Sequence, residues 1–295
     1  MKGRRYLRAG LFAVIAPCVL ACAAQTVIYE KASRYNTIVV TEDSKGLRTL
    51  LFERGGARQS VVKPGDPDHL ELSYARVAFV GLALCEEPRR VLVVGLGGGT
   101  LPTFLRKYYP NAAIDVAEID PDVVDVAKRF FGFREDERMR AHVGDGRAFI
   151  ESVRQPHYDI IFVDAYGAHN VPEHLTTREF LQAVRRAVVP SGVVVGNIWR
   201  PASNPLYASM IRTYQEAFDD LFILDVPGDV NNILLALPRK QRLTRSEFAL
   251  AARKISAAKQ FRFDLGDLVE HGFFHANEKN QDGHVLRDSD LRQPR

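Results

Sequence analysis

Cysteine is scarce in this chain. Only Cys18, Cys22 and Cys85 occur in 295 residues. The first two lie near the N-terminus, so Cys85 has no disulfide partner in the rest of the chain. No Cys/His spacing typical of a zinc site occurs, and we expect no bound metal. Cys85 follows the apolar run 77–84 and is interpreted as a small core residue.

The body of the protein also lacks an excess of basic charge. The formal net charge is +4, but residues 1–24 carry four basic side chains and no acid. The remainder therefore holds 36 basic and 36 acidic residues. Nucleic-acid-binding domains usually show a basic excess, so we expect no nucleic-acid partner.

Long hydrophobic runs are nearly absent. The longest runs from Ala9 to Ala24, which is short of the ~20 residues of a comfortable bilayer span. A basic start precedes it and small residues, 21–24, end it, as in a signal segment. Val19 to Cys22 also resembles a bacterial lipoprotein signal. We predict that residues 1–24 are a signal or membrane-anchor segment, placing the protein in the bacterial cell envelope (exported, periplasmic or membrane-attached). The alternative is a cytoplasmic protein with a misassigned start.

Strands and helices alternate along most of the remaining chain. Residues 25–68 are predicted to form an antiparallel β module with strands at 25–29, 37–41 and 48–52 and a polar loop at 53–68. Residues 69–277 begin with a helix over 70–84 and then alternate, which predicts a doubly wound, mostly parallel Rossmann-like α/β sheet. Its expected strands are 91–94, 113–117, 139–143, 158–163 and 192–196, with closing strands at 221–226 and 232–237. The expected helices are 101–109, 121–131, 147–153, 177–188, 205–218 and 246–258. Residues 278–295 are polar and are expected to fray.

A glycine cluster follows the first buried strand. Gly95, Gly97, Gly98 and Gly99 precede a helix, an arrangement that lets a ligand approach the backbone at a positive helix end. Thr100 occupies the final position of the Gly-x-Gly-x-x-Gly pattern, which disfavours a nicotinamide dinucleotide and suits a nucleoside donor such as S-adenosylmethionine. No Gly-Lys-Ser/Thr follows, which argues against a nucleotide triphosphatase.

Polar residues stand at the ends of the following strands. Glu118 is placed to accept hydrogen bonds from a ribose diol, and Asp145, followed by Gly146, from the exocyclic amine of adenine. Asp164 is placed to orient and deprotonate an ammonium nucleophile. The alternatives are a solvated acid for Glu118 and loop-capping roles for the two aspartates. Tyr74 would donate its hydroxyl into the same cleft, or be a core residue.

Three neighbouring polar residues receive structural interpretations. Arg147 is expected on a solvated helix face. His169 and His174 flank a proline without paired ligand spacing, so we interpret them as loop residues rather than metal ligands.

The pattern resembles the spermidine synthase (polyamine aminopropyltransferase) family over about residues 28–237. The strongest stretches are 91–102, 116–127, 144–147 and 158–164, with Leu175-Thr176-Thr177-Arg178-Glu179-Phe180. The resemblance implies a class I methyltransferase-type sheet with an N-terminal β module. It also implies decarboxylated S-adenosylmethionine as donor, Glu118 on ribose, Asp145 on adenine, Asp164 as base and Tyr74 as the active-site tyrosine. A homodimer or tetramer is expected on the same ground.

Several family acids are missing. Gly98 stands where the family's glycine loop has an aspartate, and Gly167 where the second loop often has one. Arg76 stands where an acid usually follows the tyrosine. Each lost carboxylate removes a charge-assisted hydrogen bond of ~1.5–3 kcal/mol, enough to change the acceptor. The chain is most similar to the divergent spermidine synthase-like branch.

Three functions follow from these residues. The first is an aminopropyltransferase-like enzyme acting on a small-molecule amine. The second is an S-adenosylmethionine-dependent methyltransferase, because a loop without its acid better tolerates the donor's carboxylate. The third is a non-catalytic nucleoside- or polyamine-binding protein.

Overall fold

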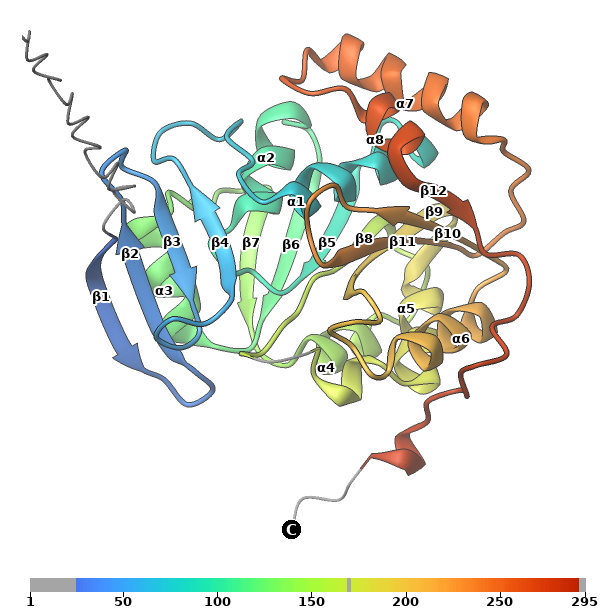
Figure 1. The fold of residues 1–295 in the computed structure, drawn as a ribbon, viewed down its shortest axis with the longest axis horizontal. Coiled ribbons are helices and arrows are strands. Elements are labelled where there is room, and N and C mark those ends of the chain that lie inside the picture. The colour runs from blue at the N-terminus through green and yellow to red at the C-terminus, as the bar shows by residue number, and fades with distance from the viewer. Residues whose placement is uncertain (1–24, 169–170, 292–295) are drawn as a thin grey trace, which may run out of the picture.

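Two β-sheets form the framework of the protein (Figure 1). The structure is a computed structural model that describes residues 25–168 and 171–291. The predicted leader, residues 1–24, lies outside these ranges. No helix in the described ranges has the length and apolar character needed to cross a membrane.

The smaller sheet is antiparallel, with strand order β1-β2-β3-β4. Its strands are β1 (Thr26–Ala32), β2 (Thr37–Glu42), β3 (Arg48–Leu51) and β4 (Arg58–Val62). The first three match the predicted strands. The prediction of a loop over 53–68 was wrong because β4 lies within it. Only Val61 and Val62 give β4 an apolar signal, and its pairing with β3 stabilises the strand.

The larger sheet has eight strands in the order β12-β10-β11-β9-β8-β5-β6-β7. Five adjacent strands, β9, β8, β5, β6 and β7, run parallel up to the β7 edge, and β11, β10 and β12 continue the sheet antiparallel beyond β9. These strands are β5 (Arg90–Val94), β6 (Ala113–Glu118), β7 (Met139–Val143), β8 (Tyr158–Val163), β9 (Val188–Trp199), β10 (Asp220–Asp225), β11 (Asn231–Leu237) and β12 (Phe273–His275). The predicted fold class, a mostly parallel Rossmann-like sheet with an N-terminal β module, is confirmed.

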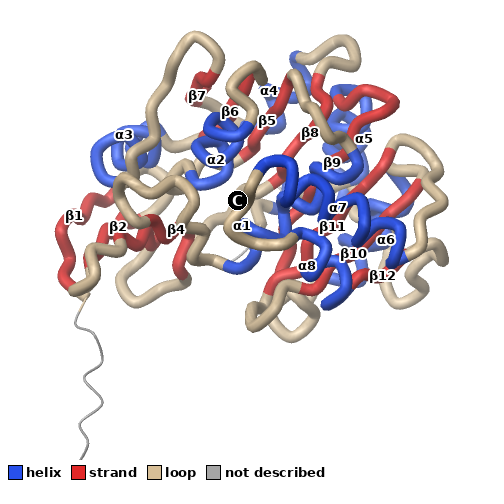
Figure 2. Tube along the Cα trace, turned by 90° about the horizontal axis from the view of Figure 1, so that it is seen from above, coloured by secondary structure: helices blue, strands red, loops and turns tan. Residues whose placement is uncertain are grey.

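Helices cover both faces of the larger sheet (Figures 1 and 2). One face packs against α1 (Ser73–Ala78), a 3-10 helix η1 (Phe79–Leu84), α2 (Thr100–Tyr108), α7 (Arg245–Lys259) and α8 (Leu265–Gly272). The other face packs against α4 (Gly146–Ser152), α5 (Arg178–Ala187) and α6 (Tyr207–Ala217). Helix α3 (Pro121–Phe130) contacts β6 and β7 of the larger sheet and forms an apolar cluster with strands of the smaller sheet, so it lies between the two. Burial on both faces explains why the central strands are continuous apolar runs.

Helix starts follow the local sequence closely. Asp120 caps α3 by accepting from the Asp122 N–H, with Pro121 at the first helical position. Thr177 caps α5 by accepting from the Phe180 N–H. The predicted helix over 70–84 is instead split into α1 and η1, after which Cys85 is partly buried against the core.

The C-terminal region packs more tightly than expected. Sequence patterns missed α8 and β12, whose segment is interrupted by Gly266 and Gly272. The expectation of fraying over 278–295 was wrong for much of the segment, since Leu286 is buried and its carbonyl accepts from the Arg178 N–H at 2.8 Å.

Arg147 explains part of this attachment. Its guanidinium forms two hydrogen bonds with the Asp288 carboxylate and a third with Glu151. The Arg147 side chain is only 18% exposed, so the prediction of a solvated position was wrong. The acid that buries it lies 141 positions away in the sequence, which a local reading of the helix could not detect.

Candidate functional site

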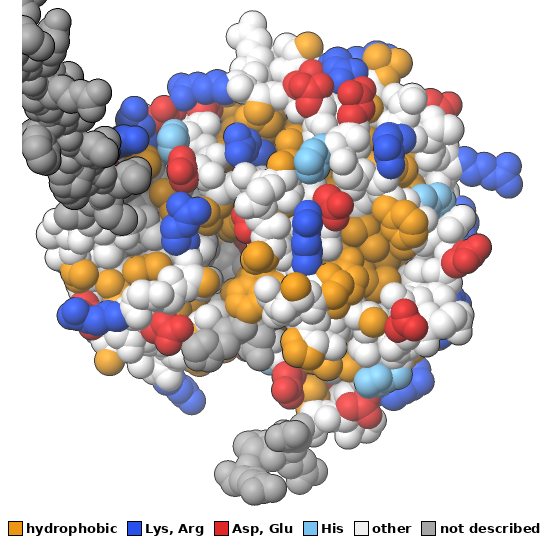
Figure 3. All heavy atoms as spheres, viewed as in Figure 1, with side chains coloured by type: hydrophobic (Ala, Val, Ile, Leu, Met, Phe, Trp, Pro, Cys, Tyr) orange, Lys and Arg blue, Asp and Glu red, His pale blue; other side chains and the backbone are white. Residues whose placement is uncertain are grey.

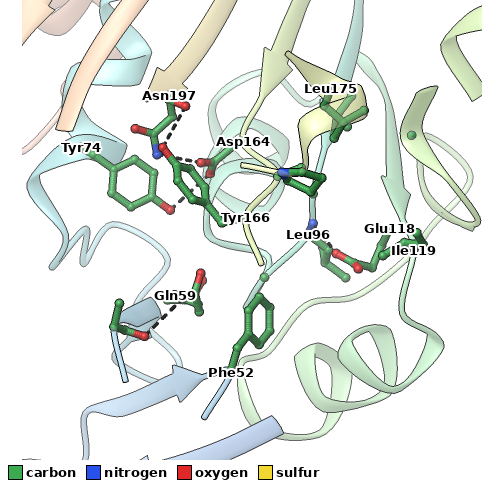
Figure 4. A pocket seen from close by; sticks show the side chains of 18 of the residues that line it. Phe52, Gln59, Tyr74, Leu96, Glu118, Ile119, Asp164, Tyr166, Leu175 and Asn197 are labelled. Atoms are coloured by element: carbon green, nitrogen blue, oxygen red, sulfur yellow. Dashed lines mark hydrogen bonds between the residues drawn. The ribbon is translucent and has the colours of Figure 1, made fainter. Parts of the chain in front are cut away.

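A cavity of about 260 Å³ opens at the carboxyl ends of the parallel strands. Strand β5 pairs with β6 on one side and β8 on the other, so the chain winds away from β5 in both directions. Crossover connections diverge at such a point and leave room for a ligand. Figure 4 shows Tyr74, Asp164, Tyr166 and Asn197 on one side of this cavity and Glu118 on the other.

Asp164 is held by hydrogen bonds on both carboxylate oxygens. Its backbone N–H donates to the Val94 carbonyl at 2.9 Å, which fixes it beside the glycine loop. The Asn197 amide donates to Oδ1 at 2.8 Å, and the Tyr74 hydroxyl donates to Oδ2 at 3.2 Å. The structure thus brings the predicted pair of Tyr74 and Asp164 into direct contact, although 90 positions separate them.

Two further residues extend this network. The Asn231 amide donates to the Asn197 side-chain oxygen at 2.7 Å, and the Tyr166 hydroxyl donates to the Asn197 carbonyl at 3.0 Å. We did not select Asn197, Asn231 or Tyr166 from the sequence. The position of Asn197 after a predicted strand was an available signal. No local feature of the sequence marked Asn231, because the pairing of β11 with β9 is what brings it to Asn197.

The surroundings of Asp164 alter its acidity. Burial raises the pKa of Asp164 to about 6, against the opposing effect of the hydrogen bonds from Asn197 and Tyr74. Burial, and then the negative charge of Asp164, raise the pKa of Tyr74 well above its usual value. At neutral pH the pair is therefore a carboxylate and a protonated phenol, an acceptor and a donor side by side.

Glu118 is fixed on the opposite wall. It is 7% exposed, and its two oxygens accept from the Leu96 N–H at 2.8 Å and the Asp120 N–H at 2.9 Å. Burial raises the pKa of this carboxyl. A carboxylate oxygen accepts more than one hydrogen bond, so Glu118 retains capacity for a diol.

Asp145 caps a helix and also lies on the cavity wall. Its Oδ1 caps α4 by accepting from the Ala148 N–H at 2.9 Å, and Asp145 also lines the cavity together with Gly146. Its Oδ2 lies 2.8 Å from His174 Nε2, a contact that sequence reasoning missed. His169 lies outside the described residues. Within the described part of the chain, no group of three His, Cys, Asp or Glu side chains is arranged to hold a metal.

The four glycines separate into two pairs. Gly95 and Gly97 line the cavity, whereas Gly98 and Gly99 line a second space of about 170 Å³ on the other side of the loop. Gly95 has φ of 94°, and a Cβ there would lie 2.4 Å from the Asp164 carbonyl oxygen, so only glycine fits. The Gly98 N–H donates to Ser60 Oγ at 2.8 Å. The structure therefore does not bring Gly98 and Gly99 to the predicted donor position.

These features define a Rossmann-like α/β protein with an added antiparallel sheet and a polar cavity at the strand ends. A family model described as the spermine/spermidine synthase domain matches residues 73–222. A polyamine aminopropyltransferase from Vibrio vulnificus is 34% identical over 250 residues, covering 81% of each chain. The chain belongs to the spermine/spermidine synthase family, which confirms the resemblance seen in the sequence.

Two solved structures are also similar. A probable spermidine synthase from Corynebacterium glutamicum superposes with a TM-score of 0.72 at 20% identity, covering 91% of this chain and all of that one, and it supports the fold. Human methyltransferase-like protein 13, solved in complex with SAH, has a TM-score of 0.59 and 31% identity, covering 64% of this chain and 92% of that chain. This chain is therefore similar both to an aminopropyltransferase and to a methyltransferase.

Proposed function

We propose that the protein transfers an aminopropyl group from decarboxylated S-adenosylmethionine to a small-molecule amine. The observation that carries the proposal is the Asp164 carboxylate, oriented by Asn197 and Tyr74 at the topological switch point of the sheet. A base with a pKa of about 6 is ionised at neutral pH and accepts a proton from an attacking amine. The homology to aminopropyltransferases supports this reaction.

The reaction exchanges one bond at carbon. The acceptor nitrogen attacks the carbon beside the sulfonium, and the carbon–sulfur bond breaks with its electron pair moving to sulfur. Methylthioadenosine leaves as a neutral thioether, and the proton of the new ammonium passes to Asp164 and then to solvent. Tyr74, which stays protonated, holds the carboxylate toward the attacking nitrogen.

The donor would lie along the opposite wall. Glu118 would accept hydrogen bonds from the ribose hydroxyls, and Asp145 from the adenine amine in place of, or together with, its contact with His174. Gly95, Gly97 and Gly146 leave the backbone open to close approach.

A second candidate is methyl transfer from intact S-adenosylmethionine. A Cβ at Gly98 would lie 2.8 Å from both Phe131 Cδ1 and Ser60 Cβ, so the loop has no room for the acid that this position lacks. Arg58 lines the cavity at the strand ends, and its positive charge would offset the carboxylate of an intact donor bound there. The likeness to a methyltransferase solved with SAH favours the same alternative.

Calorimetry with the two donors separates the candidates. Aminopropyl transfer predicts tighter binding of decarboxylated S-adenosylmethionine, together with methylthioadenosine release in the presence of a diamine panel. Preference for the intact donor, with no methylthioadenosine from any pair, would favour methyl transfer. If the protein binds a donor without turnover, and Asp164→Asn leaves the donor affinity unchanged, the result would favour a non-catalytic binding protein.

We also propose the setting predicted from the sequence, a protein attached to or exported across the bacterial membrane through residues 1–24 and assembled as a homodimer or tetramer. Intact mass of the mature protein tests the first point, and light scattering the second. On the face in Figure 3 basic and acidic side chains are interspersed, which supports a small-molecule partner over nucleic acid.

A further inference from the structure

Tyr166 and Trp199 form a stacked aromatic pair on the cavity wall. Their ring centroids lie 5.3 Å apart with an interplanar angle of 30°. Tyr166 comes from the loop after β8 and Trp199 from the end of β9, and both line the cavity. The Tyr166 hydroxyl bond to the Asn197 carbonyl fixes its ring beside the Asp164 network.

An acid accompanies this aromatic surface. Asp229, in the turn between β10 and β11, lines the same cavity, and one of its carboxylate oxygens accepts from the Val230 N–H at 2.8 Å. Burial, and then the negative charge of Asp164, raise the pKa of both Tyr74 and Tyr166, and the charge of Asp229 adds a smaller contribution to the rise. Aromatic faces attract cations through the ring quadrupole, and a nearby carboxylate strengthens the attraction.

We propose that Tyr166, Trp199 and Asp229 form a subsite for an alkylammonium group of the acceptor, with the cation against the aromatic rings and Asp229 at its rim. The inference rests on the proposed function only in taking the acceptor to be an amine. It accounts for the missing second acid of the loop at Gly167. The residue before it supplies an aromatic face where the resemblance leads one to expect a carboxylate. Such a face attracts a cation that lies over the ring.

The chain contains its own probe for this subsite. Trp199 is the only tryptophan, so intrinsic tryptophan fluorescence reports from the subsite alone. We would titrate the full chain without donor with 1,4-diaminobutane, and with 1-butanol as the neutral control. The proposal predicts a saturable fluorescence change with the diamine and none with butanol at the same concentrations. An equal response to butanol would overturn it.

Two substitutions of one residue give a matched comparison. Tyr166→Phe keeps the ring and should hold the diamine dissociation constant within about twofold, whereas Tyr166→Leu should weaken it about 2- to 30-fold, the range of one cation–π contact. Asp229→Asn should weaken it too, with a smaller dependence on salt. Circular dichroism and donor calorimetry establish that each variant is folded. A Tyr166→Leu protein that binds the diamine as tightly as the wild type would overturn the subsite.

Turnover keeps this inference separate from the proposed function. Diamine binding at Trp199 without methylthioadenosine release from any donor pair would refute the proposed function and leave the subsite standing. Methylthioadenosine release with the same acceptor KM in wild type and Tyr166→Leu would refute the subsite and leave the function standing. The expected result is a raised acceptor KM for Tyr166→Leu with kcat changed less.

Discussion

The side-chain amide of Asn197 donates to Asp164 Oδ1 at 2.8 Å, and its own oxygen accepts from Asn231. An amide that donates at one end and accepts at the other has one preferred orientation, because a flip would set donor against donor. The second asparagine therefore fixes which atom of the first meets the carboxylate. Asp164 is positioned by a chain that starts on an antiparallel strand outside the parallel part of the sheet.

The first prediction concerns pH. Protonated Asp164 cannot accept a proton, so kcat at saturating substrates should fall below a pH of about 6, the pKa that burial gives this carboxyl. Tyr74 should add no limb below pH 10, because burial and Asp164 raise its pKa. A pH–kcat profile that stays flat from pH 7 to pH 4.5 would show that Asp164 is not the base.

The second prediction compares neighbouring asparagines. Asn231→Ala frees the amide of Asn197, and the weakened hydrogen bond should move the acid limb of the kcat profile to higher pH and lower kcat by about 3- to 10-fold. Asn232→Ala is the control, since the Asn232 amide bonds Asp225 at 2.6 Å on the adjacent strand, away from Asp164. Equal shifts in the pH–kcat profiles of the two variants would show that Asn231 contributes only to stability and does not position Asp164.

The third prediction concerns the glycine loop. Gly98→Asp should not restore the family acid, because its Cβ would press on Ser60 and Phe131. The expected loss in the free energy of unfolding is ~1–3 kcal/mol, measured by urea denaturation. Ser60→Ala removes only the hydrogen bond from the Gly98 N–H and adds no crowding. We expect it to lower the free energy of unfolding by about 0.5–1.5 kcal/mol. A stable Gly98→Asp protein with tighter binding of the decarboxylated donor would contradict this view of the loop.

The fourth prediction is a gain of stability from loss of the base. The pKa of Asp164 is higher in the folded chain than its ordinary 3.8, so the native state binds more protons between about pH 4 and 6 and loses stability as the pH rises through that window. Asp164→Asn should therefore be more stable than wild type at pH 7.5, by up to ~3 kcal/mol, with the difference vanishing near pH 3.5. Thermal unfolding at the two pH values checks this, and a less stable variant at pH 7.5 would contradict it.

Much of the fold follows from local patterns. Apolar runs gave the central strands, and Asp120 and Thr177 marked helix starts, because a capping side chain acts within three residues. The strand-end acids Glu118, Asp145 and Asp164 line one cavity because parallel strands share an edge. Strand β4 was missed because its stability comes from pairing rather than composition.

The remaining site residues depend on distant contacts. Asn231, His174 and Asp229 reach the cavity from a strand, a short 3-10 helix and a turn, whose positions depend on tertiary packing. The spacing of the glycines predicted that Gly98 and Gly99 bind the donor, but the loop turns Gly98 toward Ser60 and Gly99 toward Phe133. A glycine motif indicates that a loop can adopt conformations closed to other residues. The residues packed against the loop determine which of its glycines meet the ligand.

Methylthioadenosine release tests the central claim most directly. Wild type and Asp164→Asn would be incubated at pH 7.5 with decarboxylated S-adenosylmethionine and a diamine panel, and the product measured by mass. The account predicts methylthioadenosine and an aminopropylated amine from the wild type, with a rate about 10²- to 10⁴-fold lower for Asp164→Asn. Equal rates in the two proteins, or no methylthioadenosine from the wild type with any diamine, would contradict it.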